Sequence, residues 1–175
     1  MMPRQNGDQI QPQIGHAPLY TPEQRVRRDE SVWTFVQGIL APIQFVVFLI
    51  SLGLVVRYLL TGEGYVIAAE SVVAKTMFLY LIMVTGAIWE KVVFGQYLFA
   101  PAFFWEDVFS FAVIALHTAY LYALFTGVLG PVPLMMLALA AYAAYAINAA
   151  QFILKLRAAR LDMAARDAAM PGVVA

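Results

Sequence analysis

The chain contains no cysteine and only two histidines among its 175 residues. The lack of cysteine excludes disulfides, thiolate catalysis and cysteine-rich zinc or iron–sulfur sites. His16 lies in the polar N-terminal part and His117 about a hundred residues later, so a multi-histidine metal or haem site is also excluded. The formal net charge is zero, which points to neither a nucleic acid nor a strongly anionic partner. We therefore expect no resident metal held by cysteine or by several histidines.

Charge is scarce as well, at 13% of residues against 62% hydrophobic. Residues 31–56 carry no charge over 26 positions, and residues 108–154 carry none over 47. A helix needs about 20 apolar residues to cross the hydrocarbon of a bilayer. The pattern therefore predicts an all-α integral membrane protein, a four-helix bundle with spans at about 32–58, 71–90, 107–126 and 133–154. We expect small-residue packing along Ala140/Ala144 and Ala146/Ala150, and Lys75 to extend to the headgroups from the start of the second span.

The two ends of the chain are polar. Residues 1–18 read as a disordered tail, 19–160 as one membrane domain and 161–175 as a C-terminal tail. Thr21-Pro22-Glu23-Gln24 has the form of a capping box and predicts a short, basic, amphipathic helix lying along the headgroups. Residues 1–30 lack the apolar core of a signal peptide and should stay in the cytoplasm. Basic residues concentrate at both ends, so the positive-inside rule predicts that both termini are cytoplasmic.

Three carboxylates lie beside two tryptophans where the second span ends and the third begins. Trp89-Glu90-Lys91 and Trp105-Glu106-Asp107 flank a segment rich in aromatic residues. One interpretation makes these acids interfacial charges paired with Lys91 and Lys155. The other rests on their clustering, because neighbouring carboxyl groups in a poorly hydrated site share a proton and supply an acid beside a base. That arrangement suits the addition or removal of water.

The third span places Glu106, Ser110, Val113, His117 and Tyr120 on one helical face. His117 either bonds a neighbouring helix or ligates a metal carried by the substrate. On the fourth span, Asn148 either holds helices together or orients a water molecule.

The aromatic residues of the connecting segment include Phe103 and Phe104, and they suit the rim of a site for a planar ring system. Trp89 and Trp105 are also typical of an interfacial aromatic belt.

These residues belong to longer strings that resemble the 2-vinyl bacteriochlorophyllide hydratase family of bacteriochlorophyll biosynthesis. The resemblance covers about residues 19–160 and is carried by Leu19–Asp29, Trp33–Pro42, Met83–Gln96, Leu98–Phe109, Ala115–Tyr120 and Tyr142–Phe152. It implies hydration of the ring A vinyl group of a chlorophyllide or bacteriochlorophyllide to a 1-hydroxyethyl group. It also implies a photosynthetic bacterium and its cytoplasmic or intracytoplasmic membrane.

For the hydration that the resemblance implies, one acid, one base and a flat apolar slot suffice and no separate cofactor is needed, so each residue has a hypothetical role. Glu106 or Glu90 is the neutral acid, Asp107 the base that orients water, His117 an axial ligand of the substrate's magnesium, and Lys91 the partner of its propionate. The further substrate-binding candidates are aromatic or polar residues of the same region: Trp89, Trp105, Phe103, Phe104, Tyr120 and Asn148. The competing hypothesis is a non-catalytic, tetrapyrrole-binding scaffold subunit. Either protein would contact the pigment, water and lipid, and could associate with other pigment-synthesis enzymes or with itself.

Overall fold

The computed structural model describes residues 19–169, and the predicted tail at 1–18 lies outside this range. The described part is all-α. It consists of one short helix and four long ones: α1 (Pro22–Glu30), α2 (Val32–Thr61), α3 (Tyr65–Phe94), α4 (Phe104–Thr126) and α5 (Pro131–Ala169). The four long helices are long and apolar enough to cross a membrane, which confirms the predicted fold class at that level.

Local sequence signals explain where the first helices begin and end. The predicted capping box is present: the Thr21 N–H donates to Gln24 Oε1 at 2.9 Å, and the Gln24 N–H donates to Thr21 Oγ1 at 3.3 Å. Ser31 caps α2 by accepting the Trp33 N–H at 3.2 Å. Gly62 ends α2 with φ 76°, a left-handed conformation that glycine adopts without steric cost.

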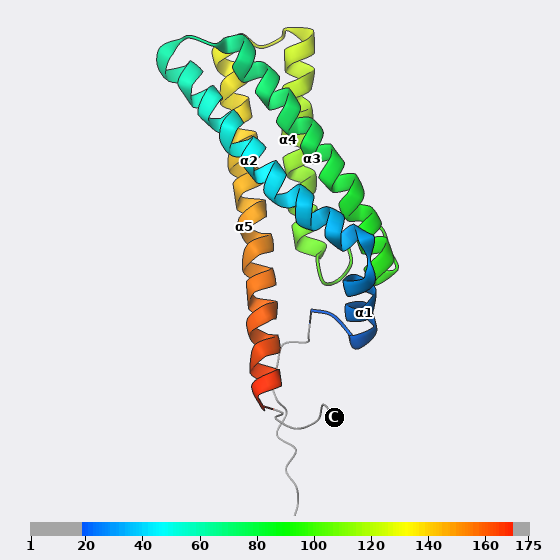
Figure 1. Cartoon of the computed structure of the whole chain (residues 1–175). Coiled ribbons are helices and arrows are strands. Elements are labelled where there is room, and N and C mark those ends of the chain that lie inside the picture. The colour runs from blue at the N-terminus through cyan, green and yellow to red at the C-terminus, as the bar shows by residue number, and fades with distance from the viewer. Residues whose placement is uncertain (1–18, 170–175) are drawn as a thin grey trace, which may run out of the picture.

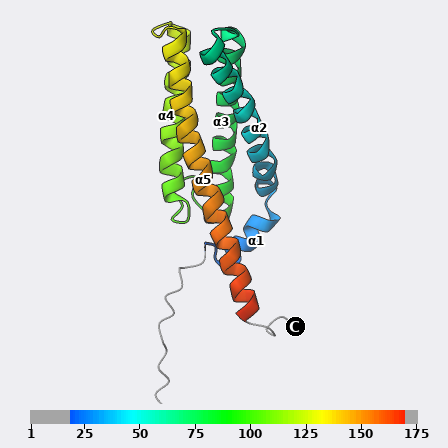
Figure 2. The same cartoon turned by 90° about the vertical axis from the view of Figure 1, so that its left-hand side faces the viewer.

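The long helices pack as two pairs, α2 on α3 and α4 on α5. Figure 2 shows the pairs side by side, and Figure 1 shows α2 and α5 crossing and then diverging toward the end of the bundle that carries α1. We call this end the α1 end. Both limits of the described chain, at residues 19 and 169, lie there (Figure 1), as an even number of long helices requires.

The middle of the bundle combines tight packing with hydroxyl contacts between helices. Val55, Val72 and Met135 are completely buried. Ser51 on α2 lies 2.5 Å from the Tyr142 hydroxyl on α5 and 2.6 Å from the Ser71 hydroxyl on α3. Because lipid tails are as apolar as leucine, helix association in a membrane depends on such packing and hydrogen bonds.

Two sequence-based expectations were wrong. Lys75 does not reach the headgroups: α3 begins at Tyr65, so Lys75 lies nearly three turns inside the helix, fully buried, with Nζ 3.8 Å from the centre of the Tyr145 ring. The alanines expected to pack the fourth span include Ala140, Ala146 and Ala150, all of which are exposed. The packed face of α5 carries other alanines, Ala138 and Ala141, together with large side chains such as Met135 and Tyr142.

Candidate active site

A cavity of about 1180 Å³ opens where α2 and α5 diverge toward the α1 end. Its walls come from α2, α3 and α5, and residues of α1, α4 and the loop between α3 and α4 complete the lining. Pockets for small ligands usually measure about 300–1,000 Å³. This cavity is therefore large enough for a ligand bigger than most metabolites, and most of its lining is apolar.

Glu90 and Asp107 form an acid pair in the wall of this cavity. Only 5% of Glu90 and 3% of Asp107 is exposed. The two carboxyl groups lie within interaction distance of each other, one from the last turns of α3 and one from the first turn of α4. The sequence predicted a cluster of acids at this junction, and the structure brings these two together.

The loop between α3 and α4 holds the acid pair through its backbone. The Phe99 N–H donates to Asp107 Oδ2 at 2.6 Å, and the Ala100 N–H donates to Glu90 Oε2 at 3.3 Å. Phe99 has φ 59°, the only positive value at a non-glycine residue in the described chain. Such a conformation costs of the order of 1–3 kcal/mol and persists where the surroundings impose it. The loop is thus shaped around the carboxylates.

The third acid, Glu106, has a different environment. Its Oε2 lies 2.7 Å from Lys155 Nζ in a largely buried ion pair between α4 and α5. Glu106 is not part of the cavity lining, whereas Lys155 is. Glu106 is therefore an acid paired with a lysine, as the first interpretation of the sequence expected. Glu90 and Asp107 are neighbouring acids, as the second interpretation expected.

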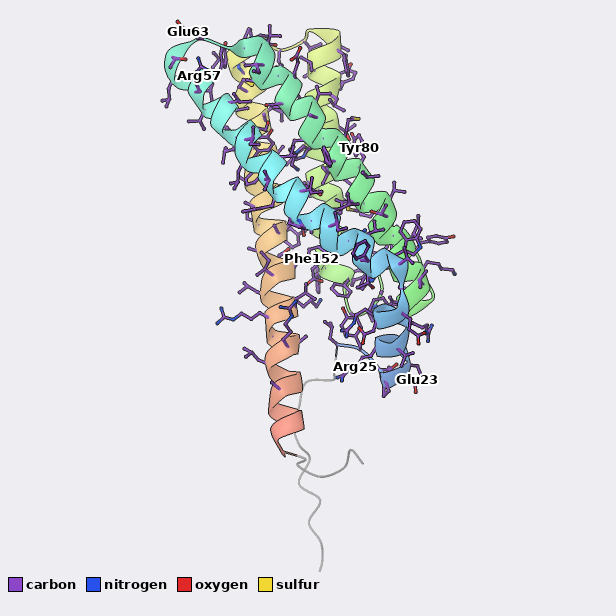
Figure 3. All side chains as sticks on the ribbon, in the orientation of Figure 1. Glu23, Arg25, Arg57, Glu63, Tyr80 and Phe152 are labelled. Atoms are coloured by element: carbon purple, nitrogen blue, oxygen red, sulfur yellow. The ribbon has the colours of Figure 1, made fainter. Side chains whose placement is uncertain are left out.

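Stacked aromatic rings form the wall of the cavity near the α1 end. Phe103 stacks on Phe152 with ring centres 5.8 Å apart, and Tyr20 stacks on Phe94 at 5.7 Å. Trp89 meets Phe103 edge to face at 5.7 Å and donates its Nε1–H to Thr34 Oγ1 at 2.9 Å. Figure 3 labels Phe152 on the α5 side of this region. Flat, rigid walls of this kind suit a planar ring system.

We call one part of the cavity its mouth, because the lining residues Asp29 and Arg160 are exposed there. It is lined by the segment before α1, by α1 itself and by α5 from Lys155 to Arg160. Burial raises the pKa of the Tyr20 phenol above its ordinary value, so this ring stays neutral. Arg28 bonds Asp29 at 2.8 Å, and this hydrogen bond lowers the pKa of the Asp29 carboxyl. No local sequence pattern indicates that α1 contributes to the site, because only the tertiary fold brings this helix to the cavity.

Several polar residues of α2 and α5 complete the lining. Gln44 is 2% exposed and Asn148 is 8% exposed. The Asn148 Nδ2–H donates to Ser110 Oγ on α4 at 2.8 Å, and the Gln37 Nε2–H donates to Thr85 on α3 at 2.7 Å. Trp89, Phe103 and Asn148, all predicted substrate contacts, therefore line the same cavity as the acid pair.

The other predicted substrate contacts do not line the cavity. His117 and Tyr120 are completely buried elsewhere in the bundle, and His117 Nδ1 lies 2.8 Å from the Val113 carbonyl oxygen. Lys91 is exposed and donates to the Gly95 carbonyl at 2.7 Å. Trp105 and Phe104 are 67% and 44% exposed and pack edge to face on each other.

The site therefore consists of a large, mostly apolar cavity with flat aromatic walls and the interacting carboxyl groups of Glu90 and Asp107. In the part of the chain that the structure describes, no group of three or more acids and histidines could hold a metal ion. The fold and site thus define a helical, membrane-type protein equipped for acid–base chemistry on a flat apolar ligand.

Comparison with known proteins assigns the family. Residues 20–158 match the family described as 2-vinyl bacteriochlorophyllide hydratase. A protein of that name from Cereibacter sphaeroides is 72% identical over 155 residues, covering 88% of this chain and 96% of the relative. Another of that name, from Rhodobacter capsulatus, is 69% identical over 150 residues, covering 86% of this chain and 87% of the relative. The chain belongs to this family. No solved structure matches it.

Proposed function

We propose that the cavity beside Glu90 and Asp107 binds a vinyl chlorophyllide or bacteriochlorophyllide and is the place where water is added to its ring A vinyl group. The chain is a hydro-lyase of bacteriochlorophyll biosynthesis, as its relatives at 69–72% identity are named for this hydration. The observation that carries the assignment of the site is the acid pair, which lies in the wall of a cavity large enough for a macrocycle.

The two carboxyl groups have complementary roles in this proposal. Asp107 accepts the shorter amide hydrogen bond, 2.6 Å against 3.3 Å for Glu90. Charged acceptors make shorter hydrogen bonds than neutral ones, which supports a carboxylate at Asp107 and a proton on Glu90. Glu106 is already neutralised by Lys155, so Glu90 is the better candidate for the proton donor.

The reaction then proceeds with a balanced transfer of protons. Glu90 gives its proton to the terminal vinyl carbon, the carbon–carbon π bond breaks, and positive charge develops on the adjacent carbon and the macrocycle. A water oxygen bonds to that carbon and its proton passes to Asp107. Because the two carboxyl groups interact across the same wall of the cavity, Asp107 can return the proton to Glu90. The net change is the addition of one water molecule, and no separate cofactor is required.

The scaffold hypothesis makes a different prediction for the same residues. Purified protein incubated with a 3-vinyl chlorophyllide should yield a product heavier by one water if the site is catalytic. Glu90→Gln and Asp107→Asn should each lower turnover by about 10² or more, the range of general acid–base catalysis, while pigment binding is retained. Glu63→Gln, at an exposed acid beyond α2, is the matched control. Near-normal turnover in both site variants would remove the acid pair from the mechanism.

The membrane placement follows from the same proposal. Four crossings with both termini cytoplasmic would put the α1 end on the cytoplasmic side of a bacterial inner membrane, and α1 would lie along the headgroups. The domain at 19–160 would then bind the pigment from that face. Figure 3 shows Arg25 at the α1 end and Arg57 at the other. Further basic residues of α1 and α5 join Arg25, namely Arg27, Arg28, Lys155, Arg157 and Arg160, so the α1 end holds the excess of basic residues that the positive-inside rule uses. Association with other pigment-synthesis enzymes or with a second copy stays a prediction.

A further inference from the structure

The mouth of the cavity carries more positive than negative charge. Its basic residues are Arg25 and Arg28 from α1 and Lys155 and Arg160 from α5. Arg28 forms an ion pair with Asp29 at 2.8 Å, and Lys155 forms an ion pair with Glu106 at 2.7 Å. Neither Arg25 nor Arg160 forms an ion pair with any carboxylate whose side chain the structure describes. Among the side chains that the structure describes, these two guanidinium groups thus have no carboxylate partner, and they come from two different helices, α1 and α5.

We infer that Arg25 and Arg160 bind the propionate carboxylate of the pigment and so select the free acid over its esters. This inference rests on the proposed function, because it takes the pigment to be the ligand of the cavity. Guanidinium is the side-chain group whose planar donors match a carboxylate. Figure 3 shows Arg25 on the side of α1 that faces α5, the helix that carries Arg160.

The position of the two arginines fits the two chemical halves of the pigment. The macrocycle is flat and apolar and suits the walls formed by Phe103 and Phe152. The propionate is charged and would be costly to bury among these rings without a partner. With its carboxylate held at the mouth, the macrocycle can enter the apolar cavity only in a restricted set of orientations. The arginines would thereby help to direct one edge of the ring system toward the acid pair.

The structure disfavours the carboxylate partner expected from the sequence. Lys91 is exposed, outside the cavity lining, and donates to the Gly95 carbonyl at the end of its own helix. Its ammonium also lies 5.4 Å from the centre of the exposed Tyr97 ring. Arg25 and Arg160 differ from Lys91 in that both line the cavity that contains Glu90 and Asp107.

The test compares the 3-vinyl chlorophyllide free acid with its methyl ester, which differs only in the charge of the propionate. Binding and turnover of both pigments are measured in detergent with the wild-type protein, Arg25→Gln/Arg160→Gln and a matched control, Arg27→Gln/Arg157→Gln. Arg27 and Arg157 lie on the same two helices but outside the cavity lining. We expect the wild type to bind the free acid about tenfold or more tightly than the ester, as loss of a charge-assisted hydrogen bond implies.

The site variant should lose the preference for the free acid, because its KM for the free acid rises while its KM for the ester changes little. The control variant should keep the preference. Equal affinity of the wild type for acid and ester would overturn the inference, and this comparison needs no variant. An equal loss for both pigments in the site variant, or the same loss in the control, would indicate instead that the arginines act on lipid headgroups or on folding. Failure of the wild type to hydrate either pigment would contradict the proposed function itself.

Discussion

Ser51 is expected to contribute twice as much to the stability of the bundle as either of its hydroxyl partners. The directions of the hydrogen bonds follow from the structure. Ser71 Oγ donates to the Ala68 carbonyl at 2.7 Å, so its single proton is used and Ser51 must be the donor in the contact between the two serines. Ser51 then accepts from Tyr142. One hydroxyl group thus connects α2 to α3 and also to α5.

The magnitude follows from counting the bonds between helices that each substitution removes. Such a bond contributes about 0.6 kcal/mol on average in membrane proteins, with a maximum of about 1.7. Ser51→Ala removes two, which predicts a loss of about 1.2 kcal/mol in the free energy of unfolding. Tyr142→Phe removes one, which predicts about 0.6 kcal/mol. The double variant should be close to Ser51→Ala alone, because the bond between Ser51 and Tyr142 is removed in both singles.

The assay is reversible unfolding in mixed micelles, followed by helical circular dichroism, with the two singles and the double measured together. Thr126→Ala is the control, since its exposed hydroxyl bonds only the Tyr122 carbonyl on its own helix. If Tyr142→Phe costs as much as Ser51→Ala, or if the two losses add fully in the double variant, Ser51 does not connect the three helices.

Three further outcomes are expected. Lys75→Met should raise the free energy of unfolding by about 1 kcal/mol. A lysine inside the membrane costs about 2.5–3.5 kcal/mol, and its cation–π contact with Tyr145 offsets only about 2 kcal/mol of this. Lower stability of the variant on thermal unfolding would show that the ammonium makes a necessary interaction. His117→Ala should lower the melting temperature and affect binding of magnesium-containing and metal-free pigments equally, because the imidazole does not line the cavity; a selective loss of the magnesium pigment would identify it as the axial ligand. A reporter fused after Gly64 should behave as periplasmic and one after Ala175 as cytoplasmic, and the reverse pattern would contradict the positive-inside argument.

Sequence reasoning was most successful where the signal is local or periodic. Charge-free length predicted four long apolar helices, and the spacing of Ser110, Val113, His117 and Tyr120 predicted the buried face of α4. The capping box at Thr21 involves residues within one turn, so it too could be read directly. Each of these features depends on the covalent order of residues and on helix geometry alone.

The failures concern which face of a helix meets which neighbour. Lys75 was expected to extend to the headgroups because its distance from the start of α3 was underestimated, and the buried side of that helix was not known. The place of Arg25 in the cavity lining depends on how α1 packs against α2 and α3, which no local pattern encodes. Among three neighbouring acids, the sequence could not tell that Lys155 on α5 would neutralise Glu106 and leave Glu90 and Asp107 together.

The left-handed backbone at Phe99 provides a spectroscopic signal for the proposed catalytic cycle. The amide of this residue is hydrogen-bonded to Asp107, and the bond weakens whenever that carboxylate takes up a proton. An unfavourable φ is then left with less support, and the loop gains freedom to relax. Labelled phenylalanine marks twelve backbone amides in this chain. Among them, the Phe99 amide should change its exchange rate and chemical shift with the location of the proton during turnover, without any probe being attached to the pigment.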